Sequence, residues 1–251
     1  INNWCGAPFE DLFQSSLPVT RNNLLYFKKN QDRYWNLFHE NQIGFNEERI
    51  TYNKNNKAIF DLESLCSYVC RHRRVAYFHH AIPEYVTDDN LQSVLQQLKP
   101  SLAVLKTVRE LRDHHHIDSN TIGIHIRKTD FGSIVNEDHI YNQIKDSAEH
   151  YFICSDASDV VDRFSQLSNC ACIAKPSFPR KLDPSGGWNG YITDEEGRTY
   201  PFNVVRDREA VYWGLVDLLL LSVTRIVITS GSSFLYLAQR LGRIGYLADV
   251  L

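Results

Sequence analysis

Short apolar segments alternate with helix-like segments after Asp118, and this alternation constrains the fold more than any other feature of the sequence. Apolar runs with the length of a buried strand lie at Thr121–Arg127, Tyr151–Ser155, Ala171–Ala174 and Arg225–Thr229. Helical spacing of apolar residues predicts helices at Ser158–Leu167, Asp207–Ser222 and Ser233–Leu241, the last ended by Gly242. Strands that alternate with helices in this way are typical of a parallel α/β sheet.

The residues before Asp118 have a mixed character. Helical patterns are expected at Pro8–Phe13, around Tyr34, Leu37 and Phe38, at Asp61–Val69, after Thr87-Asp88-Asp89 and at Ser101–His115, and a strand is expected at Val75–Phe78. The stretch Phe178–Pro201 is rich in Pro, Gly, Asp and Asn and is predicted to be a long loop. We therefore expect an α/β protein with two domains, residues 1–118 and residues 119–251.

Composition excludes several classes of protein. With 251 residues and 43% hydrophobic residues, the chain is long and apolar enough to bury a large core, unlike a disordered protein. A net charge of −3 argues against a general nucleic-acid binder, which needs a basic surface. No apolar run has the length of a membrane-spanning helix, and Ile1–Phe9 does not have the pattern of a signal peptide.

Cysteine spacing and sequon content bear on compartment and metal binding. The six cysteines are too sparse for a small disulfide scaffold and are interpreted as free thiols that act as small hydrophobic residues. No second pair at metal spacing completes a zinc site with Cys66 and Cys70. The sequence has no Asn-x-Ser/Thr site, which favours a cytoplasmic location, either soluble or associated with a membrane. The alternative is the lumen of the secretory pathway, if an anchor precedes this sequence.

A charged motif ends the first strand of the predicted sheet. Alternation in Gly123–Arg127 sends His125 and Arg127 to one face, and Ile124 and Ile126 to the other. Arg127 stands at the carboxyl end of the strand, where open α/β sheets bind ligands, and Lys128, Thr129 and Asp130 follow it. A guanidinium binds phosphate through paired hydrogen bonds, and Lys128 adds a second positive charge. The alternative is ordinary surface charge beside a hydrogen-bonded core histidine.

Small polar residues end two other predicted strands. Ser155 and Asp156 follow Tyr151–Cys154, and Ser230, Gly231, Ser232 and Ser233 lie between the last strand and a helix. Because the carboxyl ends of parallel strands share one edge, these residues are expected to lie near Arg127. Backbone N–H groups and hydroxyls of such a turn bind anions, although a simple strand-to-helix turn is the alternative.

An aspartate lies in a helix that is otherwise apolar. Asp217 is surrounded by Tyr212–Leu221, which is apolar on nearly all sides and is expected to be buried. A buried carboxylate needs a partner. We expect Asp217 either to pair with an arginine such as Arg127 or to form hydrogen bonds within the core.

These motifs together resemble the fucosyltransferases. Gly123–Asp130 is similar to the His-x-Arg-Arg-x-Asp segment of the α1,6-fucosyltransferases and to the related segment of α1,2- and protein O-fucosyltransferases. Ser155-Asp156 resembles the second motif of that family, and Val216–Phe234 resembles the third. Two departures exist: Lys128 stands in place of the second arginine, and the Gly-rich amino-terminal loop of the family is absent.

The resemblance implies an inverting GT-B-like enzyme with two Rossmann-like domains, which transfers L-fucose from GDP-fucose to a glycan or other hydroxyl acceptor without a metal or other cofactor. Residues 1–118 would serve the acceptor and residues 119–251 the nucleotide sugar. Arg127 and Asp130 would be catalytic. The residues implied to bind the donor are His125, Lys128, Ser155, Asp156, Asp217, Ser230, Ser232 and Ser233. The alternatives are another sugar nucleotide or a catalytically idle nucleotide- or glycan-binding module.

Overall fold

The computed structural model describes residues 7–15, 34–36, 50–52, 58–60, 75–77, 87–128, 136–186, 189–193, 195, 197, 199–227 and 233–248. The chain forms two compact units. One contains residues 1 and 19–83, and the other contains residues 2–18 and 84–251. The second unit therefore takes in residues on both sides of position 118, where the sequence predicted a boundary. The acceptor and donor roles given to the two sides, and the two-domain GT-B arrangement, stay predictions.

The smaller unit contains short paired strands. Its described strands are β2 (Tyr34–Asn36), β3 (Ile50–Tyr52), β4 (Ala58–Phe60) and β5 (Val75–Tyr77). Strand β2 pairs with β5 in parallel, and β3 pairs with β4 antiparallel. The strand predicted at Val75–Phe78 is confirmed as β5. The helical pattern expected from Tyr34 is wrong, because the backbone of that residue pairs with β5. Leu37, Phe38 and the helix predicted at Asp61–Val69 lie outside the described residues.

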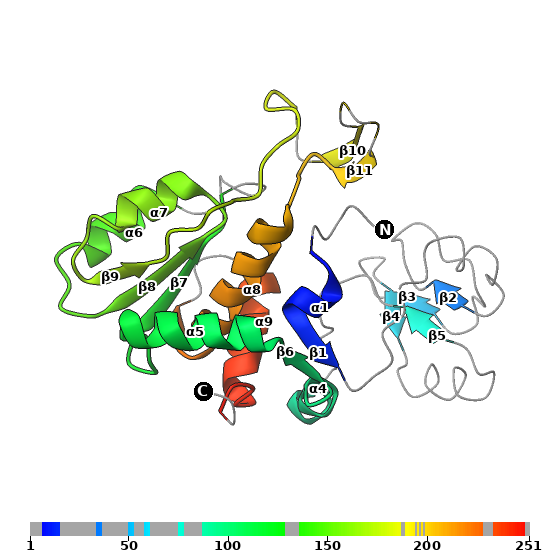
Figure 1. Ribbon diagram of the computed structural model, residues 1–251, viewed down its shortest axis with the longest axis horizontal. Coiled ribbons are helices and arrows are strands. Elements are labelled where there is room, and N and C mark those ends of the chain that lie inside the picture. Colours follow the sequence, from blue (N-terminus) through cyan, green and yellow to red (C-terminus); the bar gives the residue numbers. More distant parts are fainter. Residues whose placement is uncertain are drawn as a thin grey trace. The chain divides into compact units, whose positions relative to one another are not determined.

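A parallel sheet forms the centre of the larger unit (Figure 1), and it confirms the fold class predicted for residues after Asp118. Its strands are β7 (Ile122–Ile126), β8 (Tyr151–Ser155), β9 (Cys170–Cys172) and β12 (Arg225–Val227). They lie side by side in the order β12-β7-β8-β9, and every pair is parallel. The chain moves from β7 to β8 to β9 and then returns to place β12 on the other side of β7. The topological switch point therefore lies between β7 and β12, and ligands of open α/β sheets bind at the carboxyl end of such a point.

Helices cover both faces of the sheet (Figure 1). One face is covered by α6 (Glu137–Ile144) and α7 (Ser158–Phe164). The other face is covered by α5 (Leu102–His114), α8 (Arg208–Ser222) and α9 (Ser233–Arg243). Ile124 and Ile126 pack in the core beneath α6 and α7. Phe152 and Cys154 of the next strand pack in the core beneath α5, α8 and α9. The alternation predicted for β7 is therefore confirmed, and each face of the sheet has its own apolar core.

Glycines allow α8 and α9 to lie close to their neighbours. A Cβ on Gly123 would lie 2.1 Å from the hydroxyl oxygen of Thr224, so only a glycine fits where the end of α8 crosses β7. A Cβ on Gly242 would lie 2.5 Å from the carbonyl oxygen of Ser222. The prediction that Gly242 ends its helix is wrong, since α9 continues to Arg243. The left-handed turn lies further on, at Gly245, where φ is 61°.

Other elements surround this α/β core. They are α1 (Phe9–Leu12), β1 (Phe13–Ser15), α4 (Asp88–Leu95), β6 (Leu98–Pro100), β10 (Asn189–Thr193) and β11 (Thr199–Phe202). Strand β1 pairs with β6 antiparallel, and β10 pairs with β11 antiparallel. The long loop predicted at Phe178–Pro201 is therefore wrong in part, because its second half forms a hairpin. Asp88 and Asp89 open α4 as predicted, and Asp88 accepts a hydrogen bond of 2.8 Å from the buried Arg240 of α9.

Helix α8 lies where the sequence predicted a helix, and the Asp207 side chain caps its amino terminus. The Asp207 carboxylate accepts a hydrogen bond of 2.8 Å from the backbone N–H of Ala210 and one of 2.6 Å from the hydroxyl of Ser177. These hydrogen bonds hold the pKa of Asp207 below its ordinary value of 3.8, and the one from Ala210 has the largest effect. The carboxylate thus stabilises the amino terminus of the helix that carries Asp217.

Replacing Asp207 with alanine is expected to lower the free energy of unfolding by about 1 kcal/mol, the usual value of an N-cap, whereas Asp207→Ser should retain most of it. Because the folded pKa is depressed below the ordinary value of 3.8, this stabilisation is present above that value and is lost as pH falls through the folded pKa. Urea unfolding of the wild type and both variants at pH 7 and at pH 3 checks this. Equal stability of wild type and Asp207→Ala at pH 7 would contradict it.

Candidate functional site

The His-x-Arg motif lies at the carboxyl end of β7, beside the topological switch point. His125 is only 6% exposed, and its ring stacks on Phe234 with 4.7 Å between ring centroids and 30° between planes. Phe234 is in the first turn of α9, directly after Ser233. The His125 ring therefore lies against the first turn of α9, and the predicted proximity of Arg127 to the turn before α9 stays a prediction. Arg127 is half-buried and directly follows β7.

The end of β8 is joined to the end of β7 by polar contacts. The Ser155 hydroxyl donates a hydrogen bond of 2.7 Å to the carbonyl oxygen of Ile126 and accepts one of 3.1 Å from the N–H of Ala157. The Asp156 carboxylate accepts a hydrogen bond of 2.8 Å from the backbone N–H of Lys128. These contacts fix the course of the chain through Arg127. The structure thus brings together the predicted residues His125, Lys128, Ser155 and Asp156.

The Lys128 side chain lies against the first turns of α6 and α7. Its ammonium is 2.5 Å from an oxygen of Asp159 and 2.7 Å from an oxygen of Glu137. Hydrogen bonds to these two carboxylates raise the pKa of Lys128 above its ordinary value. Its positive charge is therefore balanced by two acidic residues, and its predicted role at a phosphate stays a prediction.

Asp217 lies within α8 and forms a buried ion pair with Lys175. The two side chains are 5% and 6% exposed. Lys175 follows β9 and also donates a hydrogen bond of 2.7 Å to the carbonyl oxygen of Ser155. Burial raises the pKa of Asp217, and the neighbouring ammonium acts in the opposite direction. The pair links α8 to the carboxyl ends of β8 and β9.

Lys175 is the site residue that the sequence analysis missed. The sequence suggested either an arginine or core hydrogen bonds as the partner of Asp217, and the ion pair in the structure is with a lysine. A signal existed, because Lys175 follows the apolar run Ala171–Ala174 as Arg127 follows β7. Cations directly after parallel strands lie at the ligand-binding edge.

Three predicted site residues, Asp130, Ser230 and Ser232, lie outside the described residues. Ser233 is described and is the exposed first residue of α9. Among the residues that the structure describes, no group of His, Cys, Asp and Glu side chains is arranged to hold a metal ion. Within the same residues, no helix combines the length and hydropathy of a membrane span.

The described cysteines carry free thiols. Cys154, Cys170 and Cys172 form no disulfide. Burial raises the pKa of Cys170 to about 11 and that of Cys172 to about 12, and it raises the pKa of Cys154 as well. These thiols are therefore neutral near pH 7, in agreement with the interpretation that they are free thiols.

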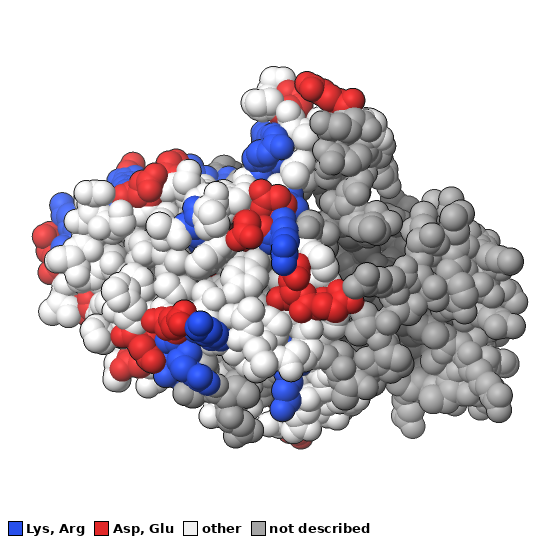
Figure 2. Space-filling model, viewed as in Figure 1, with Lys and Arg blue, Asp and Glu red and all other residues white. Residues whose placement is uncertain are grey.

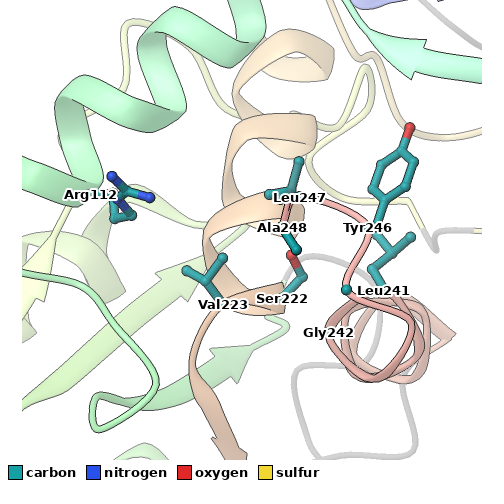
Figure 3. Close-up of a pocket in the computed structure, with 9 residues that line it drawn as sticks. Arg112, Ser222, Val223, Leu241, Gly242, Tyr246, Leu247 and Ala248 are labelled. Atoms are coloured by element: carbon teal, nitrogen blue, oxygen red, sulfur yellow. The ribbon is translucent and has the colours of Figure 1, made fainter. Parts of the chain in front are cut away.

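A cavity of about 370 Å³ lies at the opposite end of the strands from the His-x-Arg motif (Figure 3). Its lining residues are Arg112, Ser222, Val223, Leu241, Gly242, Gly245, Tyr246, Leu247 and Ala248. Ser222 and Val223 are at the end of α8, just before β12 begins, which places the cavity at the amino ends of the strands. We assign the candidate site to the opposite, carboxyl edge, because the charged and polar strand-end residues lie there.

Figure 2 shows acidic and basic side chains interspersed over the described part of one face, without a broad basic patch.

Fold and site together define an α/β protein whose parallel sheet presents His, Arg, Ser and Asp residues at one edge. No protein-family model matches the chain, and no curated protein matches it. Among solved structures, the chain is similar to NodZ α-1,6-fucosyltransferase soaked with GDP-fucose, with 17% identity and a TM-score of 0.40 over 62% of this chain and 47% of that chain. It is similar to fucosyltransferase NodZ from Bradyrhizobium, with 16% identity and a TM-score of 0.38 over 61% of this chain and 46% of that chain. The chain thus spans just under half of the length of these enzymes.

Proposed function

We propose that this chain binds a nucleotide sugar at the carboxyl edge of β7 and β12 and transfers L-fucose from GDP-fucose to a glycan or another hydroxyl acceptor, with inversion. One observation carries the proposal. The His125-x-Arg127 motif stands at the end of a central parallel strand, beside the switch point, and the His125 ring stacks on the first turn of α9. A guanidinium and a helix amino terminus at one sheet edge suit a pyrophosphate.

The proposed chemistry is stabilisation of a leaving group. As the bond between fucose and phosphate breaks, negative charge grows on the departing GDP, and a fixed cation lowers the energy of that state. Arg127 is proposed to hold the β-phosphate, and Asp130 to orient Arg127 or to contact the sugar. The other proposed donor-binding residues are His125, Lys128, Ser155, Asp156, Asp217, Ser230, Ser232 and Ser233. The reaction is proposed to need no metal or other cofactor.

Lys128 is proposed to contribute less than Arg127. Its ammonium reaches phosphate only if it leaves Glu137 and Asp159, which hold it at 2.7 Å and 2.5 Å. Exchange of one set of anionic partners for another yields a smaller net gain than a new ion pair does. Most of the stabilisation of the leaving group is therefore assigned to Arg127.

Isothermal titration with GDP, UDP and dTDP, and with the corresponding sugar nucleotides, tests the donor. We expect GDP to bind at least about tenfold more tightly than the other two diphosphates, a difference of roughly 1.4 kcal/mol. A preference for UDP or dTDP would mean that the donor has another base and another sugar, while the proposed phosphate site would still hold. Absence of binding by all of them would contradict the proposal as a whole.

The contacts of Lys128 favour a second candidate function, a catalytically idle nucleotide-binding module. In such a module the Lys128 ammonium would remain paired with Glu137 and Asp159, and the leaving group would lack one of its two cations. GDP binding without release of fucose from GDP-fucose, in water or with a panel of sugar and peptide hydroxyl acceptors, would favour this candidate.

A further inference from the structure

The Lys175–Asp217 ion pair joins three separate elements at the candidate site. Asp217 belongs to α8, Lys175 follows β9, and the same ammonium donates to the carbonyl oxygen of Ser155 at the end of β8. Both side chains of the pair are almost completely buried. An ion pair in such a position is costly to desolvate and is seldom the most stable choice, so it calls for a reason other than stability.

The two oxygens of the Asp217 carboxylate differ in their partners. Oδ2 pairs with Lys175, whereas Oδ1 is buried and receives no hydrogen bond from any residue that the structure describes. A buried acceptor without a donor costs free energy, and most such atoms in native proteins have a partner. A ligand that supplies an N–H or O–H group to Oδ1 would remove this cost.

The position of the pair relates it to the rest of the site. Lys175 binds the carbonyl oxygen of Ser155, and Ser155 is the register partner of Ile126, the residue between His125 and Arg127. One strand, β8, therefore lies between β9, which Lys175 follows, and β7, which carries the charged motif.

Two thiols near the pair carry no charge. Cys154 of β8 and Cys172 of β9 interact electrostatically with Asp217, and burial raises the pKa of both thiols, so they are neutral. His125 of β7 lies on the same face of the sheet as Cys154, its register partner. Within the described part of the chain, Lys175 is the cation that acts on the Asp217 carboxylate.

We propose that Lys175 is a positioning residue of the nucleotide-sugar site: it keeps the Asp217 carboxylate charged and fixed against the end of β8, with Oδ1 directed to a hydrogen-bond donor of the nucleotide. This inference rests on the proposed function, because it assumes that a nucleoside diphosphate occupies this edge of the sheet. It assigns Lys175 a role through Asp217 and not through direct contact with phosphate.

A double-mutant cycle with GDP as the probe tests the inference. The variants are Lys175→Met, Asp217→Asn and the combination of both, with Lys175→Arg as the conservative variant and the exposed Lys106→Met as a matched control. We expect Lys175→Met to weaken GDP binding at least about tenfold and Lys175→Arg to recover most of that loss. In the Asp217→Asn background, Lys175→Met should have little further effect, because the residue acts through Asp217. Lys106→Met should leave the affinity unchanged.

The pH dependence of GDP binding distinguishes a positioning role of Lys175 from a merely structural role. Without Lys175, the Asp217 carboxyl takes up its proton at a higher pH than in the wild type. The ratio of the GDP dissociation constants of Lys175→Met and wild type is therefore expected to grow as pH falls from 8 to 5.5, whereas the ratio for Asp217→Asn should stay flat.

Several outcomes would overturn the inference. An equal loss caused by Lys175→Met in both backgrounds would mean direct contact with the ligand, and a ratio that does not change with pH would mean a structural role only. If Lys175→Met does not fold, the double variant, which buries no unpaired charge, supplies the comparison with Asp217→Asn. Wild-type protein that binds no nucleotide would instead contradict the proposed function, so the two failures are distinguishable.

Discussion

Replacing Arg127 with alanine is expected to lower the rate of fucose release from GDP-fucose at least about a hundredfold, as is typical when one donor to the transition-state charge is lost. Arg127 directly follows β7, and the chain around it is fixed by the contacts of Ser155 and Asp156. The backbone that carries Arg127 is therefore anchored on both sides. Under the proposed function, removal of the guanidinium would leave the departing diphosphate without its main cation.

Initial rates of GDP release, measured with the acceptor panel, check this prediction. Arg127→Lys keeps the charge and loses the planar pair of donors, so its rate should lie between those of the wild type and Arg127→Ala. The matched control is Lys106→Ala on the exposed face of α5, which should retain the wild-type rate. A rate of Arg127→Ala near that of the wild type, at unchanged melting temperature, would refute the role of Arg127.

Replacing Asp217 with alanine is expected to lower the free energy of unfolding by about 3–5 kcal/mol, the usual cost of removing one partner of a buried ion pair. The change leaves the Lys175 ammonium at 6% exposure, with the carbonyl oxygen of Ser155 as a neutral acceptor in place of a carboxylate. The combination of Asp217→Ala with Lys175→Met removes both charges and should restore part of the lost stability.

Urea unfolding at pH 7 measures these differences. The control is Glu110→Ala, which breaks the Lys106–Glu110 pair on the surface of α5, where both side chains are more than half exposed. A surface pair of this kind contributes about 0–1 kcal/mol. If Asp217→Ala and Glu110→Ala cost the same, the Lys175–Asp217 pair does not behave as a buried pair.

Strong local patterns made much of the larger unit predictable. The apolar run Tyr151–Ser155 is β8 to the residue, and the helix predicted at Asp207–Ser222 is α8 with Asp207 as its cap. Helix α6 was not predicted, because it is eight residues long and buries only Ile140 and Ile144, too few for a clear periodicity. The β10–β11 hairpin was not predicted either, since its sequence is rich in turn-forming residues.

The candidate site was predictable where topology alone decides position. Strand ends of a parallel sheet meet at one edge, so the proximity of His125, Ser155 and Asp156 followed from the order of apolar runs. Side-chain direction after a strand does not follow from any periodicity, which is why the contacts of Lys128 with Glu137 and Asp159 were not foreseen. The partner of Asp217, Lys175, lies 42 positions earlier in the chain, and no local pattern encodes a pairing over that separation.

The close approach of Gly242 to the Ser222 carbonyl has a mechanical consequence. Helix α8 carries Asp217, and α9 carries Phe234 against the His125 ring. Since the backbones of the two helices approach without an intervening side chain, α8 and α9 cannot come closer at this point without steric overlap. A shift of α8 toward α9 at this point would therefore be passed on to α9, which carries the Phe234 ring that stacks on His125.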